Sequence, residues 1–156
     1  MKNHNVRRAG GSAGVQARCQ AVPFNRILVV DDDTDLRLLS AEVLSRSGYR
    51  VDTAEDGAAG WEALHGNNYD LLITDHNMPK VSGIELVKKV RSARMALPVI
   101  LASGALPTEE LNRHPWLQLA ATLVKPFSSG QLLETVKEVL AQPTVRTAAS
   151  GSTSRR

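Results

Sequence analysis

The sequence contains a single cysteine, Cys19, in 156 residues. One cysteine cannot form a disulfide within the chain, so a disulfide framework is excluded and a reducing compartment fits. No apolar run approaches the roughly 18 uninterrupted residues that a membrane-spanning helix needs. The first 22 residues also lack the apolar core of a signal peptide. These absences predict a cytoplasmic protein without membrane insertion.

Acidic residues are missing from both ends of the chain. Residues 1–25 carry four basic side chains and residues 143–156 carry three, and neither segment contains an acid. The segment between them holds 12 basic and all 16 acidic residues, a net charge of about −4, although the whole chain has a formal charge of +3. Because a folded nucleic-acid-binding domain needs a basic face, we expect no specific nucleic-acid partner.

Neither end of the chain shows a hydrophobic period. The first stretch is rich in Gly, Ala, Ser and Arg, and the last, PTVRTAASGSTSRR, is similar. We therefore predict a disordered basic tail over residues 1–24, one domain over residues 25–141 and a disordered tail over residues 142–156. The hydrophobic content of 42% suits a single domain with a sizeable core.

Between the tails, apolar runs typical of strands alternate with patterns typical of helices. The expected strands cover residues 26–30, 49–54, 70–75, 98–103 and 120–125. Five helices are expected. The first ends at Gly48, the second covers residues 57–67 and the third begins at Gly83. The fourth covers residues 107–114 and is ended by Pro115, and the fifth follows a cap at Ser128 or Ser129. This alternation predicts the α/β class, with a doubly wound five-stranded parallel sheet, five helices and right-handed crossovers.

Apolar side chains at helical spacing identify the first and last of these helices. The first stripe consists of Leu36, Leu39, Val43 and Leu44. The last consists of Leu132, Leu133, Val136, Val139 and Leu140, which we expect to face inward.

Polar side chains stand at the ends of four of the expected strands. They are Asp31, Asp32, Asp33 and Asp35 after the first, Asp75 at the end of the third, Ser103 at the end of the fourth and Lys125 at the end of the fifth. In an open parallel sheet, function gathers at the carboxyl ends of the strands. We therefore expect several carboxylates, one hydroxyl and one ammonium to converge on one edge.

Such a group of residue types suits phosphoryl chemistry. Like charges at close quarters repel, and a hard divalent cation such as Mg²⁺ takes oxygen ligands of this kind. A carboxylate beside Mg²⁺ can act as a nucleophile toward phosphorus and form an aspartyl phosphate. Lys125 can then pair with one phosphoryl oxygen, and the hydroxyl of Ser103 can donate to another.

Three simpler interpretations apply to the DDDTD segment. Asp33, immediately before a helix, is the residue expected to act only as a helix cap. Asp31, Asp33, Asp35 and Glu42 match the spacing of an EF-hand calcium loop, but the sixth position is Leu36 instead of glycine and a strand precedes it. The Asp-x-Asp motif of haloacid-dehalogenase-type phosphohydrolases matches Asp31 and Asp33, but its fifth position is Asp35 and the chain has no room for a cap domain.

Taken together, the segments ILVVDDD, DLLITDHNMPKVSG, PVILASG and LVKPF resemble the receiver domain of two-component response regulators. The resemblance spans about residues 25–141. It implies a flavodoxin-like fold with strand order 2-1-3-4-5, a cis Lys125–Pro126 bond, and signalling that depends on Mg²⁺.

The resemblance also implies a role for individual residues. Asp75 corresponds to the phosphoacceptor, and Asp31 and Asp32 to the acidic pair that binds the metal together with the main-chain carbonyl of Asn77. Ser103 corresponds to the switch hydroxyl and Lys125 to the phosphate-binding lysine. One position departs from the family: Thr122 stands where an aromatic second switch residue is usual, and it cannot fill the pocket of an aromatic ring. His76 is expected to be an outward loop residue.

The resemblance implies a single-domain response regulator. It would accept a phosphoryl group on Asp75 from a sensor histidine kinase or a histidine phosphotransfer protein. It would signal to an unknown downstream protein by contact or by onward phosphotransfer. We expect self-modification and self-dephosphorylation, and no turnover of an external substrate. The alternatives are a weakly phosphorylated or constitutive receiver-fold adaptor, supported by Thr122, and a phosphohydrolase.

Overall fold

The computed structural model describes residues 25–142. The predicted tails therefore lie outside the described residues, apart from Gln142. The strands are β1 (Arg26–Val30), β2 (Arg50–Ala54), β3 (Leu71–Asp75), β4 (Val99–Ser103) and β5 (Ala121–Val124). The α-helices are α1 (Thr34–Arg46), α2 (Gly57–Gly66), α3 (Gly83–Ser92), α4 (Thr108–Arg113) and α5 (Ser129–Ala141). A 3₁₀ turn, η1 (Pro115–Leu117), follows α4.

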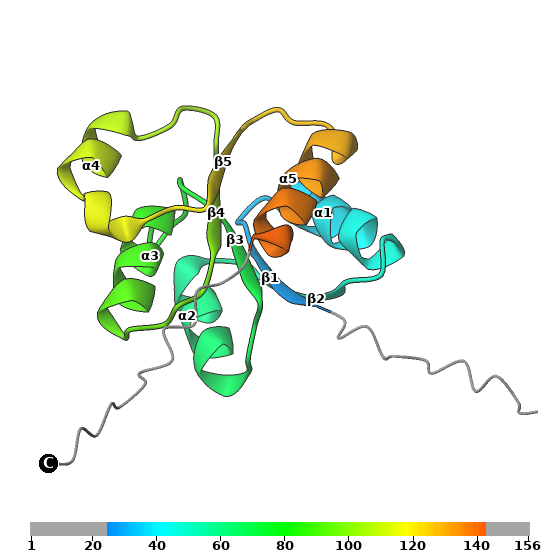
Figure 1. Cartoon of the computed structure of the whole chain (residues 1–156), viewed down its shortest axis with the longest axis horizontal. Coiled ribbons are helices and arrows are strands. Elements are labelled where there is room, and N and C mark those ends of the chain that lie inside the picture. The colour runs from blue at the N-terminus through cyan, green and yellow to red at the C-terminus, as the bar shows by residue number, and fades with distance from the viewer. Residues whose placement is uncertain (1–24, 143–156) are drawn as a thin grey trace, which may run out of the picture.

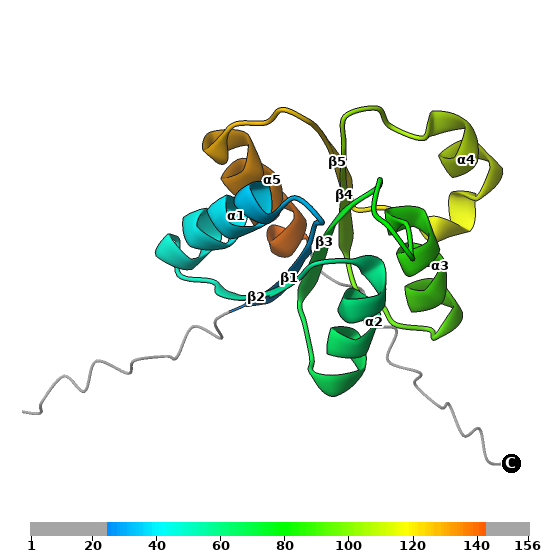
Figure 2. The same ribbon diagram turned by 180° about the vertical axis from the view of Figure 1, so that it is seen from behind.

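The strands form one parallel sheet in the order β2-β1-β3-β4-β5, as the resemblance implies (Figure 1). The two central strands, β3 and β4, are buried along their whole length, which explains their uninterrupted apolar sequences. Helices α1 and α5 cover one face of the sheet, and α2 and α3 cover the other (Figure 2). The architecture is the predicted doubly wound α/β fold.

Alternate side chains of each strand enter two separate cores. Leu28, Leu72 and Leu101 pack with α2 and α3, whereas Ile27, Leu71 and Ile100 pack with α1 and α5. The expected inward residues of α5 join the second core: Leu132, Val136 and Val139 are buried, and Leu133 and Leu140 are partly buried. The strands are thus fixed on both faces, which holds their carboxyl ends in place.

The apolar stripe of α1 is only partly buried. Leu39 is 53% exposed, and Ser40 is buried in its place together with Leu44. An α-helix makes one turn every 3.6 residues, so Ser40 and Leu44, four positions apart, share the buried side, whereas Leu39 lies about a quarter of a turn from Ser40. The hydrophobic character of Leu39 suggested burial, but the helix axis decides which side faces inward.

Helix α4 is shorter than expected and is weakly packed. It has no buried residue, and Pro107, the residue before its first turn, provides no side-chain cap. The 3₁₀ turn that follows was not predicted; it begins at Pro115 and buries Leu117 against the core of α2 and α3. The segment is therefore anchored through its last turn. Within residues 25–142, no helix combines the length and apolar character needed to cross a bilayer.

Candidate functional site

The consecutive aspartates after β1 have separate structural roles. Asp31 is 5% exposed, and its Oδ1 accepts a hydrogen bond of 2.9 Å from the main-chain N–H of Asp33. Asp33 caps α1 by accepting from the N–H of Leu36, as predicted. Asp32 is exposed at the edge of the sheet. One aspartate therefore caps the helix, and two remain for another task.

Asp75 ends the buried strand β3 and is 7% exposed. Its Oδ1 accepts a hydrogen bond of 2.8 Å from the N–H of His76. One carboxylate oxygen from each of Asp31, Asp32 and Asp75 lies within 4.8 Å of the others. The strand order brings these three residues together because β1 and β3 are neighbours. The predicted convergence of carboxylates is confirmed.

Lys125 lies between two of these carboxylates. Its Nζ is 2.9 Å from Oδ2 of Asp31 and 3.2 Å from Oδ1 of Asp75. β5 is an edge strand that pairs only with β4, so the lysine side chain reaches past the end of β4 to its partners. The peptide bond between Lys125 and Pro126 is cis, as expected.

The electrostatics of the site reflect burial and mutual repulsion. Burial raises the pKa of Asp75, Lys125 opposes this shift, and the negative charge of Asp31 adds to it. Burial alone would lower the pKa of Lys125, but its ion pairs with Asp31 and Asp75 together raise it. Lys125 thus stays charged, while Asp75 is harder to ionise than an ordinary aspartate.

The three carboxylates fit a hard divalent cation. Their oxygens form an all-oxygen donor set of the kind that Mg²⁺ prefers, and the exposed position of Asp32 leaves one side open to water. Mg²⁺ bound at this site would reduce the repulsion between the carboxylates and draw electron density from a phosphoryl oxygen.

The loop over residues 76–82 carries Asn77, whose main-chain carbonyl is the fourth predicted ligand. Asn77 is exposed, and the loop is closed by a hydrogen bond of 2.9 Å from the N–H of Gly83 to the carbonyl of His76. A Cβ on Gly83 would overlap the carbonyl oxygen of Asp75. Only glycine therefore lets α3 start this close to the end of β3.

Ser103 ends β4 and is fully buried. Its Oγ donates to the carbonyl of Ala105 at 2.7 Å and accepts from the N–H of the same residue at 3.3 Å. The hydroxyl is thus engaged with the loop that leads to α4 and not with a carboxylate. The structure places Ser103 at the expected strand end.

The side chains of Thr122 and His76 are not part of the cluster of carboxylates and Lys125. Thr122 is exposed on β5, where it pairs with Leu101 of β4. His76 is half-buried, and its Nδ1 is buried without a hydrogen-bond partner among residues 25–142. His76 lies in the loop after β3, as expected, but the burial of Nδ1 shows that one edge of its ring packs against the protein.

Sequence reasoning missed Arg37, whose Nη1 donates to the main-chain carbonyl of Asp31 at 2.7 Å. This contact ties the first turn of α1 to the end of β1 and places a guanidinium beside the acidic pair. An arginine one turn into an amphipathic helix gives no signal of such a contact, because the contact depends on how the helix packs.

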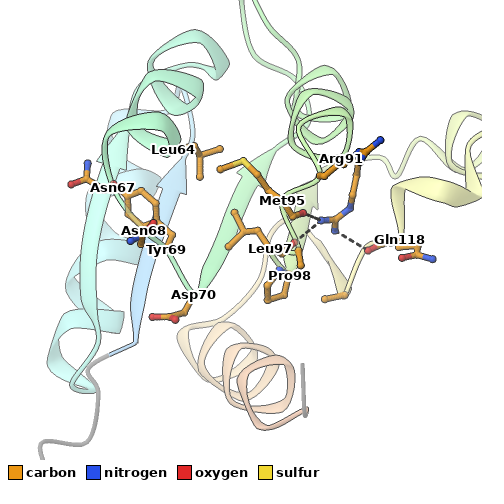
Figure 3. Close-up of a pocket in the computed structure, with 13 residues that line it drawn as sticks. Leu64, Asn67, Asn68, Tyr69, Asp70, Arg91, Met95, Leu97, Pro98 and Gln118 are labelled. Atoms are coloured by element: carbon orange, nitrogen blue, oxygen red, sulfur yellow. Dashed lines mark hydrogen bonds between the residues drawn. The ribbon is translucent and has the colours of Figure 1, made fainter. Parts of the chain in front are cut away.

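A cavity of about 700 Å³ lies at the opposite, amino-terminal edge of the sheet (Figure 3). Arg91 of α3 borders it and donates hydrogen bonds to the carbonyls of Met95, Leu97, Leu117 and Gln118. The guanidinium therefore joins the α3–β4 loop to the connection that leads into β5. None of the predicted site residues lies there.

The chain is similar in sequence to known regulatory proteins. The family described as "Response regulator receiver domain" matches residues 27–137. Chemotaxis protein CheY1 of Helicobacter pylori is 38% identical over 119 residues, which cover 74% of this chain and 96% of that protein. The transcriptional regulatory protein RprY of Bacteroides fragilis is 33% identical over 115 residues, covering 74% of this chain and 49% of that protein.

The chain spans about half the length of the transcriptional regulators that it matches. Among solved structures, that of the response regulator protein TrrA from Thermotoga maritima in complex with Mg²⁺-BeF is 35% identical. It aligns with a TM-score of 0.66 and covers 74% of this chain and 98% of that chain.

Proposed function

This chain belongs to the family of response regulator receiver domains of two-component signalling, and from that membership we propose that it is a Mg²⁺-dependent phosphorylation switch with Asp75 as its acceptor. The phosphoryl donor is a phosphohistidine of a sensor histidine kinase or of a histidine phosphotransfer protein. The chain carries its signal onward by contact with another protein or by transfer of the phosphoryl group.

The contact of Lys125 with both Asp31 and Asp75 carries this proposal. It places an ammonium beside the attacking carboxylate, where the phosphoryl oxygens would arrive. The burial of Asp75 at the end of a rigid strand holds its oxygen in one position, which favours in-line attack. Asp31 and Asp32 complete an acidic group that would hold the metal.

In the proposed step, a carboxylate oxygen of Asp75 attacks phosphorus and forms a P–O bond. The P–N bond to the donor imidazole breaks, and its electron pair stays on the nitrogen. Lys125 holds one oxygen of the transferred group, and the hydroxyl of Ser103 donates to another once it leaves Ala105. Hydrolysis of the resulting acyl phosphate by water returns Asp75, so the chain modifies itself and turns over no external substrate.

Mass spectrometry of the intact protein after incubation with Mg²⁺ and acetyl phosphate tests the proposal. We expect one phosphoryl group per chain in the wild type, none in Asp75→Asn and one in the matched control Asp33→Asn, because Asn keeps the helix cap. An adduct that persists in Asp75→Asn would contradict the assignment. No adduct in the wild type would favour the constitutive adaptor, and repeated turnover of a phosphate ester would favour a phosphohydrolase.

A further inference from the structure

The loop over residues 76–82 contacts the start of α2 as well as the end of β3. Gly57, the first residue of α2, has no room for a side chain, because a Cβ there would overlap the carbonyl oxygen of Val81. The loop and the N-terminus of α2 are therefore in direct contact. Residues of α2 can influence the position of the loop.

An ion pair spans this contact. Nζ of Lys80 lies 3.1 Å from Oδ2 of Asp56, the residue that caps α2. The side chain of Lys80 is 68% exposed, whereas that of Asp56 is 7% exposed. The main chain at Lys80 has φ of 68°, a left-handed conformation that is uncommon for residues other than glycine. A lysine thus occupies a turn position where its backbone conformation is unfavourable.

Both oxygens of Asp56 have a partner. Oδ1 accepts a hydrogen bond of 2.8 Å from the N–H of Ala59, and Oδ2 binds Lys80. The main-chain N–H of Ala59 and the hydrogen bond from Lys80 lower the pKa of Asp56. The carboxylate is therefore charged at neutral pH and serves the helix and the loop at once.

We propose that Lys80 and Asp56 form a clamp that positions the loop over residues 76–82, and with it the main-chain carbonyl of Asn77, for binding Mg²⁺. The inference rests on the proposed function. Lys80 and Asp56 are positioning residues, because they act through the loop and do not touch the metal. No role in metal binding follows from the sequence for either residue.

The physical basis of the clamp is preorganisation. Asn77 is exposed, so the carbonyl that it contributes must be held by the rest of its loop. If the loop is free before the metal arrives, binding must also supply the entropy cost of ordering it, which weakens affinity. Lys80 is 68% exposed, and an ion pair with a solvated partner contributes little to global stability. The clamp should therefore affect Mg²⁺ affinity more than the melting temperature.

Three variants separate the clamp from the helix cap. Lys80→Gln removes the cation, and Asp56→Asn removes the anion while keeping a good capping side chain. The double variant tests whether the two residues act together. If they do, the loss of Mg²⁺ affinity in the double variant is smaller than the combined losses of the two single variants. Lys80→Arg restores a cation, and Lys137→Gln, on the exposed side of α5, is the matched control for loss of charge.

Isothermal titration of the metal-free protein with Mg²⁺ is the main measurement. We expect each single variant and the double variant to bind about 10-fold more weakly than the wild type, the lower end of the loss caused by disrupting groups that support metal ligands. Lys80→Arg should recover most of the affinity, and Lys137→Gln should match the wild type. Hydrogen exchange without metal should be faster at residues 76–82 in Lys80→Gln, with an unchanged melting temperature.

The possible failures can be told apart. A wild type that binds no Mg²⁺ would overturn the proposed function and the clamp with it. A wild type that binds Mg²⁺ with an affinity that Lys80→Gln leaves unchanged would overturn the clamp alone. A double variant whose loss equals the product of the single losses would show that Lys80 and Asp56 act independently, which also contradicts the clamp.

Discussion

The ammonium of Lys125 lies 2.9 Å from Oδ2 of Asp31, although 94 positions separate the two residues in the sequence. The same ammonium lies 3.2 Å from Asp75. In the absence of metal, Lys125 is therefore the cation that keeps these two carboxylates close together.

Replacing Lys125 with Met should slow phosphorylation of Asp75 by acetyl phosphate by about 100-fold or more. The variant removes the ammonium that stabilises charge on the transferred group, a loss of the size seen for single oxyanion donors. The rate of adduct formation measured by mass spectrometry checks this. Lys137→Met is the control for loss of charge, and an unchanged rate in Lys125→Met would rule out the assigned role.

The stability of Asp75→Asn should depend on pH in a defined direction. Burial raises the pKa of Asp75, with Lys125 opposing and Asp31 adding to the shift. The folded protein then holds this proton more tightly than the unfolded chain, so ionisation costs stability once the pH exceeds the unfolded pKa of roughly 3.9. Without Mg²⁺ at pH 7, Asp75→Asn should therefore be more stable than the wild type.

Urea denaturation at several pH values measures this difference. The gap should close as the pH falls below the unfolded value, because the wild-type carboxyl is then protonated in both states. Asp70→Asn, at the other end of β3, controls for the substitution itself. A gap that stays constant with pH would contradict the electrostatic explanation.

Mg²⁺ should stabilise the protein against heat, and Asp32 should be required for the effect. At a metal concentration ten times the dissociation constant, binding adds about 1.4 kcal/mol. Asp32→Asn should lose most of this gain, because it removes one of the three clustered carboxylates. Asp35→Asn removes an exposed acid of the same segment and should keep the gain. Thermal melts of the wild type and both variants, with and without Mg²⁺, measure the gain.

Substituting Gly83 with Ala should destabilise the fold by about 2 kcal/mol or more, because its Cβ would overlap the carbonyl of Asp75 and force the main chain apart. Gly66→Ala is the control, since a Cβ at the end of α2 meets nothing within 4 Å. Chemical denaturation measures both. Equal stability of the two variants would show that the main chain at the β3–α3 junction can shift at little cost in free energy.

The strand ends explain why much of the site could be predicted. Apolar runs place Asp75 and Ser103 at the ends of buried strands, and a parallel sheet brings such ends to one edge. Neither inference needs knowledge of a side-chain conformation. A doubly wound parallel sheet predicts that Asp31, Asp32, Asp75 and Lys125 converge on one edge, and in the structure these side chains do lie together.

Features that depend on packing could not be predicted in this way. The burial of Ser40 instead of Leu39 depends on the rotation of α1 about its axis, which hydrophobicity alone does not determine. Lys80 and Asp56 join two loops and lie 24 positions apart. In the sequence, Lys80 looks like an ordinary surface lysine and Asp56 like an ordinary helix cap. Arg91 is similar, because its partners are carbonyl groups and carry no side-chain signature.

The hydrogen bonds of Ser103 affect how easily its hydroxyl can change partner. Its hydroxyl binds both polar groups of a residue only two positions away, so this resting state needs no distant partner. A phosphoryl group on Asp75 would have to outcompete this local pair. The strength of the β4–α4 turn would then set how readily the Ser103 hydroxyl leaves Ala105 for the phosphoryl group.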